Sequence, residues 1–243
     1  MKVINFIGYS DKTEIMLYVA KIVQSFGNNV LYIDSISTQK CRYIIPTIEE
    51  EGNVKDKYIT TFEDIDIAIG FKSKKEIVDY LNEYNEDFNN YDYVFIDTNT
   101  EQMCSDFDVV NANTTFCITT YDRQDIIKTS VLMQILQENK QDYIEKININ
   151  RVYWYTLLNA AETKYIDVDF KALGIEWDKK DVYIPLDEND KTIVIQNQYS
   201  EKMKFKELSK MFKKALIEMT EIIMPEQTNA TITKVFKNIE RRI

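Results

Sequence analysis

The chain has 243 residues, of which 44% are hydrophobic and 29% charged, and its formal net charge is −10. This length and composition predict one large α/β domain, and no apolar run reaches the roughly 18 residues of a membrane-spanning helix. The acidic balance argues against general DNA binding, which depends on neutralising phosphates. With no histidine and three cysteines without CxxC spacing, the sequence predicts no metal site and a reducing cytoplasm.

Apolar periodicity predicts an alternation of strands and helices along most of the chain. The segment from Thr38 to Lys72 gives no clear pattern. Alternating elements of this kind favour a doubly wound, mostly parallel sheet covered by helices on both faces. In chain order, the expected elements are strand Lys2–Ile7, helix Glu14–Phe26, strand Asn29–Ser35, helix Ser73–Phe88, strand Tyr91–Asn99, strand Thr114–Thr120, helix Asp122–Glu138, strand Arg151–Asn159, short helix Asp169–Leu173, strand Asp181–Asp187 and helix Ser200–Met224.

Several of the expected strands end in residues that suit a nucleotide site. The first strand is followed by Gly8 and then by Lys12-Thr13, the second ends at Asp34, and the third ends at Asp97. The strand "RVYWYTLLN" ends at Asn159. Because parallel strands end at one edge of a sheet, these residues are expected to meet there.

The order and spacing of these motifs resemble the ParA/MinD branch of the P-loop ATPases. "GYSDKT" stands where that family has its deviant Walker A loop, "VLYIDS" and "YDYVFIDTN" resemble its second strand and its Walker B strand, and "YIPLDEND" resembles its IP-x-D segment. The resemblance covers residues 1–224 and implies a P-loop NTPase-like domain. It assigns nucleotide binding to Gly8, Lys12, Thr13, Asp97 and Asn159, and, if the site is active, catalysis to Lys12, Asp34 and Asp97.

The loop also departs from the family pattern in ways that affect its chemistry. No glycine follows Gly8 before Lys12, the loop is two residues short, and Tyr9 occupies the position of the family's signature lysine. Asp11 places a negative charge where phosphate would lie. Two like charges 4 Å apart repel each other by about 4 kcal/mol at an effective dielectric near 20. Ile36 stands where the family has the acid that positions water. We therefore expect a degenerate, pseudo-ATPase site without a cofactor, the alternatives being weak binding of ATP and Mg²⁺ or slow hydrolysis.

Relatives of this fold include the nitrogenase iron protein, which holds an iron–sulfur cluster through cysteines. Cys104 and Cys117 do not match that spacing, and Cys117 lies within an expected buried strand. The sequence therefore predicts ordinary thiols and no cluster.

Residues 225–243 form a separate segment, a polar linker followed by an amphipathic helix. At 100° per residue, five apolar side chains fall within an arc of about 100°. The last twelve residues carry four basic side chains and one acid, which is typical of a helix that binds anionic lipid. Docking on a partner and packing on the chain's own domain remain alternatives. The residues concerned are Ile232, Val235, Phe236, Ile239 and Ile243 on the apolar side, with Lys234, Lys237, Arg241 and Arg242 as the basic residues.

Together these features predict a non-hydrolysing ParA/MinD-like scaffold that is cytoplasmic and peripheral at the inner face of the membrane. It is expected to form a homodimer and to recruit or localise a membrane-associated assembly such as pilus, secretion, conjugation or division machinery, most similar to the TadZ/CpaE type. The alternative is an active or slow ATPase of plasmid or chromosome partition or of division-site positioning, and a third possibility is a structural subunit. Anionic lipid is an expected partner and DNA is not.

Overall fold

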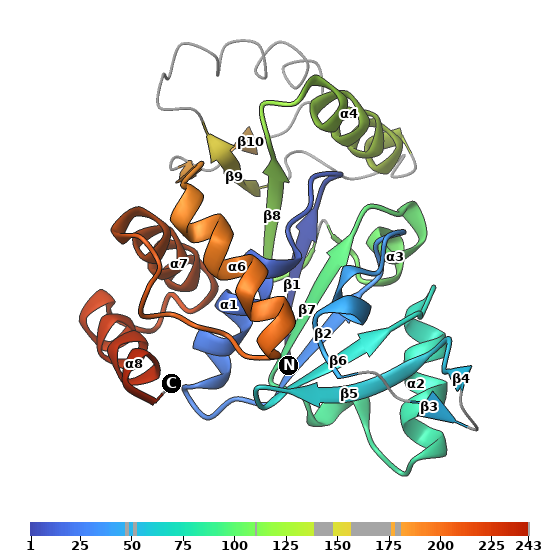
Figure 1. The fold of residues 1–243 in the computed structure, drawn as a ribbon. Helices are drawn as coiled ribbons and strands as arrows, with labels where there is room; N and C mark the ends of the chain where they lie inside the picture. Colours follow the sequence, from blue (N-terminus) through green and yellow to red (C-terminus); the bar gives the residue numbers. More distant parts are fainter. Residues whose placement is uncertain are drawn as a thin grey trace.

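The fold is built on a nine-stranded sheet in which all strands run in the same direction except the edge strand β5, which is antiparallel to β6 (Figure 1). This computed structural model describes residues 1–46, 49–50, 53–109, 111–138, 148–156, 176–177 and 181–242. The order across the sheet is β10-β9-β8-β1-β7-β2-β6-β5, and β11 also pairs with β9. The strands are β1 (Lys2–Ile7), β2 (Val30–Asp34), β5 (Tyr58–Phe62), β6 (Ile65–Ile69), β7 (Tyr93–Thr98), β8 (Thr114–Thr119), β9 (Asn148–Thr156), β10 (Glu176–Trp177) and β11 (Val182–Pro185), with β3 (Glu49–Glu50) and β4 (Asn53–Val54) forming a separate hairpin.

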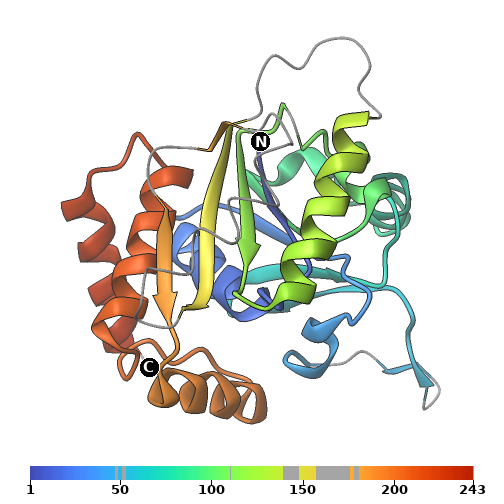
Figure 2. The ribbon, with the colours of Figure 1, turned by 90° about the horizontal axis from the view of Figure 1, so that it is seen from above.

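Helices cover both faces of this sheet, which confirms the predicted doubly wound α/β architecture (Figure 2). Helices α1, α7 and α8 pack on one face, while α2, α3 and α4 pack on the other. Strands covered on both sides need apolar residues throughout, and β7 is accordingly buried along its whole length. The helices are α1 (Thr13–Gln24), α2 (Lys74–Glu83), α3 (Glu101–Asp106), α4 (Arg123–Glu138), α6 (Glu188–Ser200), α7 (Lys210–Ile223) and α8 (Asn229–Arg242), with short 3₁₀ turns η1 (Lys40–Tyr43) and η2 (Phe88–Asn90).

The expected helix Ser200–Met224 is confirmed only from Lys210 to Ile223, because residues 201–209 separate α7 from a preceding helix, α6, that ends at Ser200. Helix α6 starts after Asp187, whose carboxylate accepts the N–H of Asp190, and it stops at Glu201, which has a φ of 49°. Helix α7 starts only after Ser209, whose hydroxyl accepts the N–H of Phe212. Each cap accepts a hydrogen bond from a backbone N–H of the first helical turn, which would otherwise have no partner. The helix is therefore interrupted between α6 and α7. The expected short helix Asp169–Leu173 lies outside the described residues.

Of the alternatives for the last segment, the structure shows packing on the chain's own domain and not a lipid-binding helix, because the apolar side of α8 is part of the main core. Ile232, Phe236 and Ile239 are 0%, 3% and 4% exposed, and α8 contacts both α7 and α1. The ring of Phe236 meets Phe205 edge-on at 5.5 Å between centroids. Docking removes the apolar side chains from water within the chain itself, so that side is not available for lipid or a partner in this structure.

The rest of α8 follows the predicted amphipathic pattern. Val235 is half-buried, and Lys234, Lys237 and Arg241 are exposed. Glu240 forms an ion pair with Lys213 of α7 at 2.7 Å. Ile243 and the side chain of Arg242 lie outside the described residues. In the described part of the chain, none of the helices combines the length and the apolar character needed to cross a bilayer.

Because Phe236 is buried in the core and packs against Phe205, Phe236→Ala should lower the free energy of unfolding by about 3 kcal/mol through lost burial and a cavity. The matched control is Asn238→Ala on the exposed side of the same helix, which should change it by less than about 0.5 kcal/mol. Urea denaturation followed by circular dichroism measures both. Equal stability of the two variants would show that α8 does not contribute to the core.

Candidate functional site

The candidate site lies at the carboxyl edge of the sheet, where the loop after β1 meets the ends of β2 and β7. The strand register places Asp34 directly opposite Asp97 and pairs Ile7 with Thr98. The loop from Gly8 to Lys12 leads straight into α1 at Thr13. The structure therefore brings together the predicted residues Gly8, Lys12, Thr13, Asp34 and Asp97, while Asn159 lies outside the described residues.

The loop after β1 is closed down onto its neighbours. Gly8 has a φ of 129°, and a Cβ at this position would lie 2.3 Å from the carbonyl oxygen of Ile118, so only glycine fits. The hydroxyl of Ser10 donates to that same carbonyl oxygen at 2.7 Å. The N–H of Tyr9 donates to the hydroxyl of Thr129 at 3.1 Å. A backbone N–H that could have contacted a phosphate is therefore already bonded, and no sequence motif marks Thr129 as its acceptor.

Lys12 points into the protein and is completely buried. Its Nζ donates to the carbonyl oxygen of Gly8 at 2.9 Å and lies 2.7 Å from Oδ1 of Asp97. The contact with Asp97 is an ion pair without the angular geometry of a hydrogen bond. The cation expected to face a phosphate is thus neutralised by the chain's own carboxylate.

Asp97 receives further support from two hydroxyl groups at its second oxygen. Tyr32 donates to Oδ2 at 2.9 Å and Thr13 donates to it at 3.3 Å. Burial and the charge of Asp97 hold the pKa of Tyr32 well above its ordinary value, so this hydroxyl keeps its proton. A buried ion pair is stable only when such hydrogen bonds offset the loss of hydration, and Asp97 has them.

Asp34 lies beside this pair but has no cation of its own among the described residues. Its Oδ2 accepts the N–H of Cys41 at 2.8 Å, while its Oδ1 has no hydrogen-bond partner in the described part of the chain. Burial, and then the charge of Asp97, raise the pKa of Asp34 to about 7, and the N–H groups of Cys41 and Ile36 oppose this shift. The carboxyl group of Asp34 is therefore partly protonated near neutral pH.

The rim of the site is occupied by a second set of charges. Lys40 of η1 contacts the carboxylates of both Asp11 and Glu14, and Gln198 of α6 donates to Glu14 at 2.8 Å. The negative charge expected at Asp11 is therefore paired within the chain. Ile36, at the position of the family's water-positioning acid, is buried.

The three cysteines are free thiols in the core. Burial raises the pKa of Cys104 and Cys117 to about 12, which makes both poor metal ligands at neutral pH. Within the described residues, no group of three or more acidic or cysteine side chains is arranged to hold a metal ion.

The sequence matches no protein-family model and no curated protein. Solved structures, however, share the fold over nearly the whole chain. The MinC:MinD cell division protein complex of Aquifex aeolicus aligns with a TM-score of 0.59 at 12% identity, covering 94% of this chain and 98% of that chain. A plasmid partition protein of Borrelia burgdorferi B31 bound to AMPPNP gives 0.57 at 15%, covering 93% and 99%. A complex of a Cyanothece McdA variant with ATP gives 0.53 at 12%, covering 94% and 98%. The chain therefore has the fold of these MinD and ParA ATPases, as the sequence motifs predicted.

Asp34→Asn should flatten the pH dependence of stability between about pH 4 and pH 7. Below about pH 4 the carboxyl group of Asp34 is protonated in both the folded and the unfolded state, so its titration does not change the free energy of unfolding there. As the pH rises, the unfolded state loses this proton first, and the wild-type protein is progressively destabilised until the folded pKa of about 7 is passed. At pH 8 the neutral amide should be favoured by at most about 4 kcal/mol, at 1.36 kcal/mol per pKa unit. Urea midpoints of both proteins from pH 4 to pH 8 measure this, and parallel curves would contradict it.

Lys12→Met should destabilise the protein by about 3–5 kcal/mol, because it leaves Asp97 as an uncompensated buried charge. The double variant K12M/D97N removes both charges and should recover most of that loss, a coupling that a double-mutant cycle measures. Exposed Lys206→Met is the matched control and should change stability by less than about 0.5 kcal/mol. Additive effects of K12M and D97N would show that the pair does not hold the loop in place.

Proposed function

We propose that this protein is a degenerate, non-hydrolysing member of the ParA/MinD-like ATPases that acts as a positioning scaffold. The observation that carries the proposal is the complete burial of Lys12 against Asp97. A P-loop lysine must reach the phosphates of the nucleotide, whereas the ammonium group of Lys12 is paired with Asp97 inside the protein.

The surrounding loop supports the same conclusion. To bind a phosphate, Lys12 would have to leave Asp97, and Asp97 would then be buried without a counter-charge, which is strongly destabilising. The N–H of Tyr9 is already donated to Thr129, so fewer backbone donors remain to surround an anion. Phosphoryl transfer depends on positioning and on stabilising developing charge, and this loop has lost groups for both.

The positioning role rests on the fold and on what the similar proteins are named for. One belongs to a cell division protein complex and another is a plasmid partition protein. We extend to this chain the general task of recruiting or localising a larger assembly, of the pilus, secretion, conjugation or division kind. A membrane anchor at α8 is not part of the proposal, since the apolar side of that helix is buried in the domain.

An active or slow ATPase is the second candidate, and one observation favours it. Gly8, Lys12, Thr13 and Asp97 do converge at the carboxyl edge of the sheet, which is the arrangement a working site would also need. The two candidates differ in whether Lys12 can exchange Asp97 for a phosphate.

Calorimetry with ATP and Mg²⁺, combined with a phosphate-release assay, separates these candidates. For the scaffold we expect no saturable binding at millimolar ATP and no phosphate release above that of K12M/D97N, which serves as the folded control without the lysine. Saturable ATP binding or steady turnover that is present in the wild-type protein and absent from K12M/D97N would overturn the scaffold and support the ATPase.

A further inference from the structure

The charges of this acidic protein are distributed unevenly along its sequence. Residues 201–242 carry ten Lys or Arg and six Glu, a net charge of +4, although the whole chain is −10. Residues 61–92 carry nine acidic side chains and three Lys, a net charge of −6. The first segment includes α7 and α8 on one face of the sheet, and the second includes α2 on the other face (Figures 1 and 2). The two segments touch where the N–H of Met203 donates to Glu63, but they differ in charge: the first is a basic segment and the second an acidic segment.

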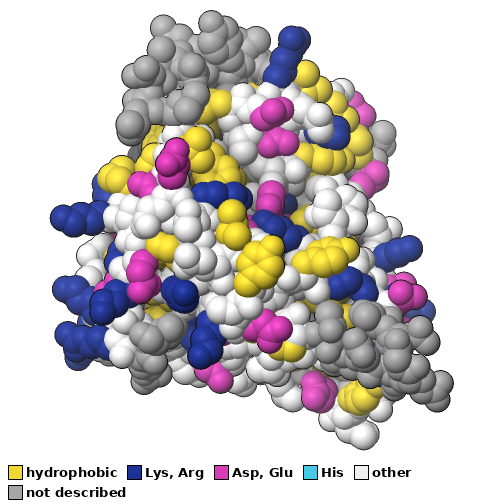
Figure 3. All heavy atoms as spheres, in the orientation of Figure 1, with side chains coloured by type: hydrophobic (Ala, Val, Ile, Leu, Met, Phe, Trp, Pro, Cys, Tyr) yellow, Lys and Arg dark blue, Asp and Glu magenta, His cyan; other side chains and the backbone are white. Residues whose placement is uncertain are grey.

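In the basic segment, α8 presents Lys234, Lys237 and Arg241, which we call the basic stripe. Residues spaced by three and four lie on one side of a helix, and these three span about 10 Å at 1.5 Å per residue. All three are exposed and none of them forms an ion pair with the described part of the chain. Because the opposite side of α8 is held in the core by Ile232 and Phe236, the stripe is fixed facing outward. Lys and Arg side chains gather over α7 and α8 at the left of Figure 3.

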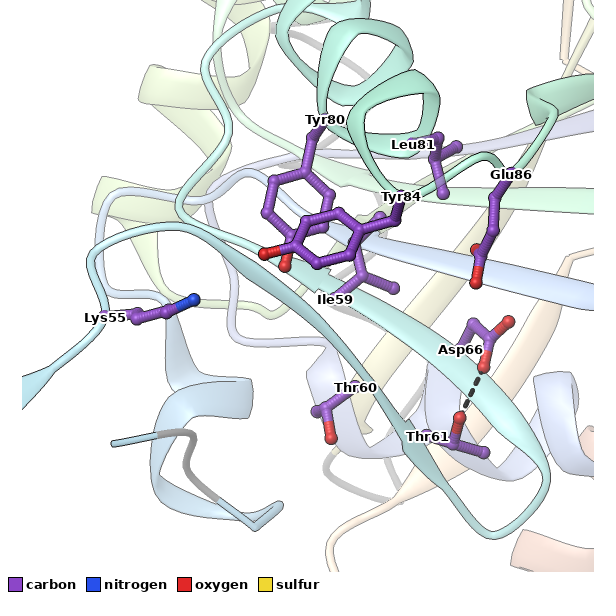
Figure 4. A pocket seen from close by; sticks show the side chains of 9 residues that line it. All are labelled: Lys55, Ile59, Thr60, Thr61, Asp66, Tyr80, Leu81, Tyr84 and Glu86. Atoms are coloured by element: carbon purple, nitrogen blue, oxygen red, sulfur yellow. Dashed lines mark hydrogen bonds between the residues drawn. The ribbon is translucent and has the colours of Figure 1, made fainter. Parts of the chain in front are cut away.

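The acidic segment lines a cavity of about 320 Å³ between β5, β6 and α2, which we call the aromatic groove (Figure 4). Tyr80 and Tyr84 form one wall, with ring centroids 4.8 Å apart and a tilt of 36°. Tyr84 is 55% exposed, so its ring is accessible to a ligand. Ile59 of β5 supplies apolar surface to the same cavity.

Two carboxylates stand at one end of the aromatic groove. Asp66 and Glu86 line both this groove and a neighbouring cavity of about 240 Å³, so they separate the two spaces. Asp66 accepts hydroxyl hydrogen bonds from Thr61 at 2.7 Å and from Tyr91 at 3.0 Å, but neither carboxylate forms an ion pair with the described residues. Lys55 lies at the other end of the groove in Figure 4. Exposed aromatic rings beside carboxylates without a counter-charge are the surroundings that a guanidinium or ammonium group binds.

We propose that the basic stripe of one copy docks in the aromatic groove of the next copy, so that the protein associates head to tail. Arg241 places its guanidinium over Tyr84 and against Glu86, and the lysines of the stripe face the remaining acids around Asp66. The occupant is a second copy because the complementary surfaces belong to the same chain yet lie on opposite faces of one sheet, α8 on the face of α1 and α7 and the groove on the face of α2, so they cannot meet within a molecule. A contact between two different surfaces generates rings or open chains of molecules instead of a closed two-fold dimer. Neither surface includes the loop from Gly8 to Thr13.

Sedimentation velocity without nucleotide tests this assembly, at about 0.02 M and about 0.5 M salt, where the screening length differs several-fold. We expect the wild-type protein to exceed the mass of a dimer as its concentration rises at low salt, and to be a monomer at high salt. The stripe variant K237E/R241E and the groove variant Y84A/E86K should each be monomeric at low salt. The matched control R123E/K128E on α4 makes the same change in net charge as the stripe variant and should associate like the wild-type protein.

Mixing tests the direction of the contact. The stripe variant keeps an intact groove and the groove variant keeps an intact stripe, so an equal mixture of the two should form a complex that neither forms alone. A wild-type protein that stays monomeric at low salt, or an association that R123E/K128E weakens as much as K237E/R241E, would overturn the proposal. So would an association that Tyr9→Ala abolishes, because that would place the contact at the loop after β1. If K237E/R241E changed only binding to phosphatidylglycerol vesicles, the stripe would be a lipid surface and the proposal would again be overturned.

Discussion

The buried ion pair between Lys12 and Asp97 is the interaction on which the architecture of the candidate site depends. An ammonium group and a carboxylate in a dry interior are costly unless both are well surrounded. Here the carbonyl oxygen of Gly8 faces the ammonium group, and the hydroxyls of Thr13 and Tyr32 face the carboxylate. The short loop makes this possible, because it leaves Lys12 close enough to Gly8 to turn inward. Loop length, loop conformation and the start of α1 are therefore determined together.

The same ion pair explains why the two aspartates at equivalent strand ends have different bonding partners. Asp34 and Asp97 are in register on adjacent strands, but the described residues supply a single cation between them. Asp97 takes the cation and two hydroxyl groups, whereas Asp34 takes a backbone N–H from Cys41 and is left with one unbonded oxygen. Repulsion from Asp97 adds to burial in favouring the protonated form of Asp34. The carboxyl edge of the sheet thus gives its two aligned aspartates different partners.

Much of the fold could be predicted from the sequence, because buried parallel strands are continuous apolar runs. The six expected strands correspond to β1, β2, β7, β8, β9 and β11, with ends that differ by a few residues. The β5–β6 pair was not predicted, since Thr60, Thr61 and Asp66 interrupt its apolar pattern. The apolar periodicity does not predict the interruption before α7, because it does not identify Asp187 and Ser209 as the N-caps of α6 and α7. The periodicity of α8 predicted which side is apolar, but periodicity does not identify the surface that covers it.

The candidate site was predictable as a set of residues and not as a set of contacts. Strand ends and topology determine that Lys12, Asp34 and Asp97 meet. The inward direction of Lys12 depends on three-dimensional neighbours, such as Tyr32, that carry no recognisable motif. The hydrogen bond from the N–H of Tyr9 to Thr129 also joins residues 120 positions apart, and no local motif predicts it. Burial and pairing are tertiary properties, which local patterns do not encode.

The inward-facing lysine also has an evolutionary consequence. Once Lys12 and Asp97 stabilise the core, natural selection can preserve both for folding even in a lineage that never uses nucleotide. Loss of either residue, or of Gly8, would be removed by selection because the variant is unstable, while the loop positions between Gly8 and Lys12 can change. Conservation of a Lys-Thr pair and a strand-end aspartate among distant homologues could then result from selection for stability, and it would not by itself identify an ATPase.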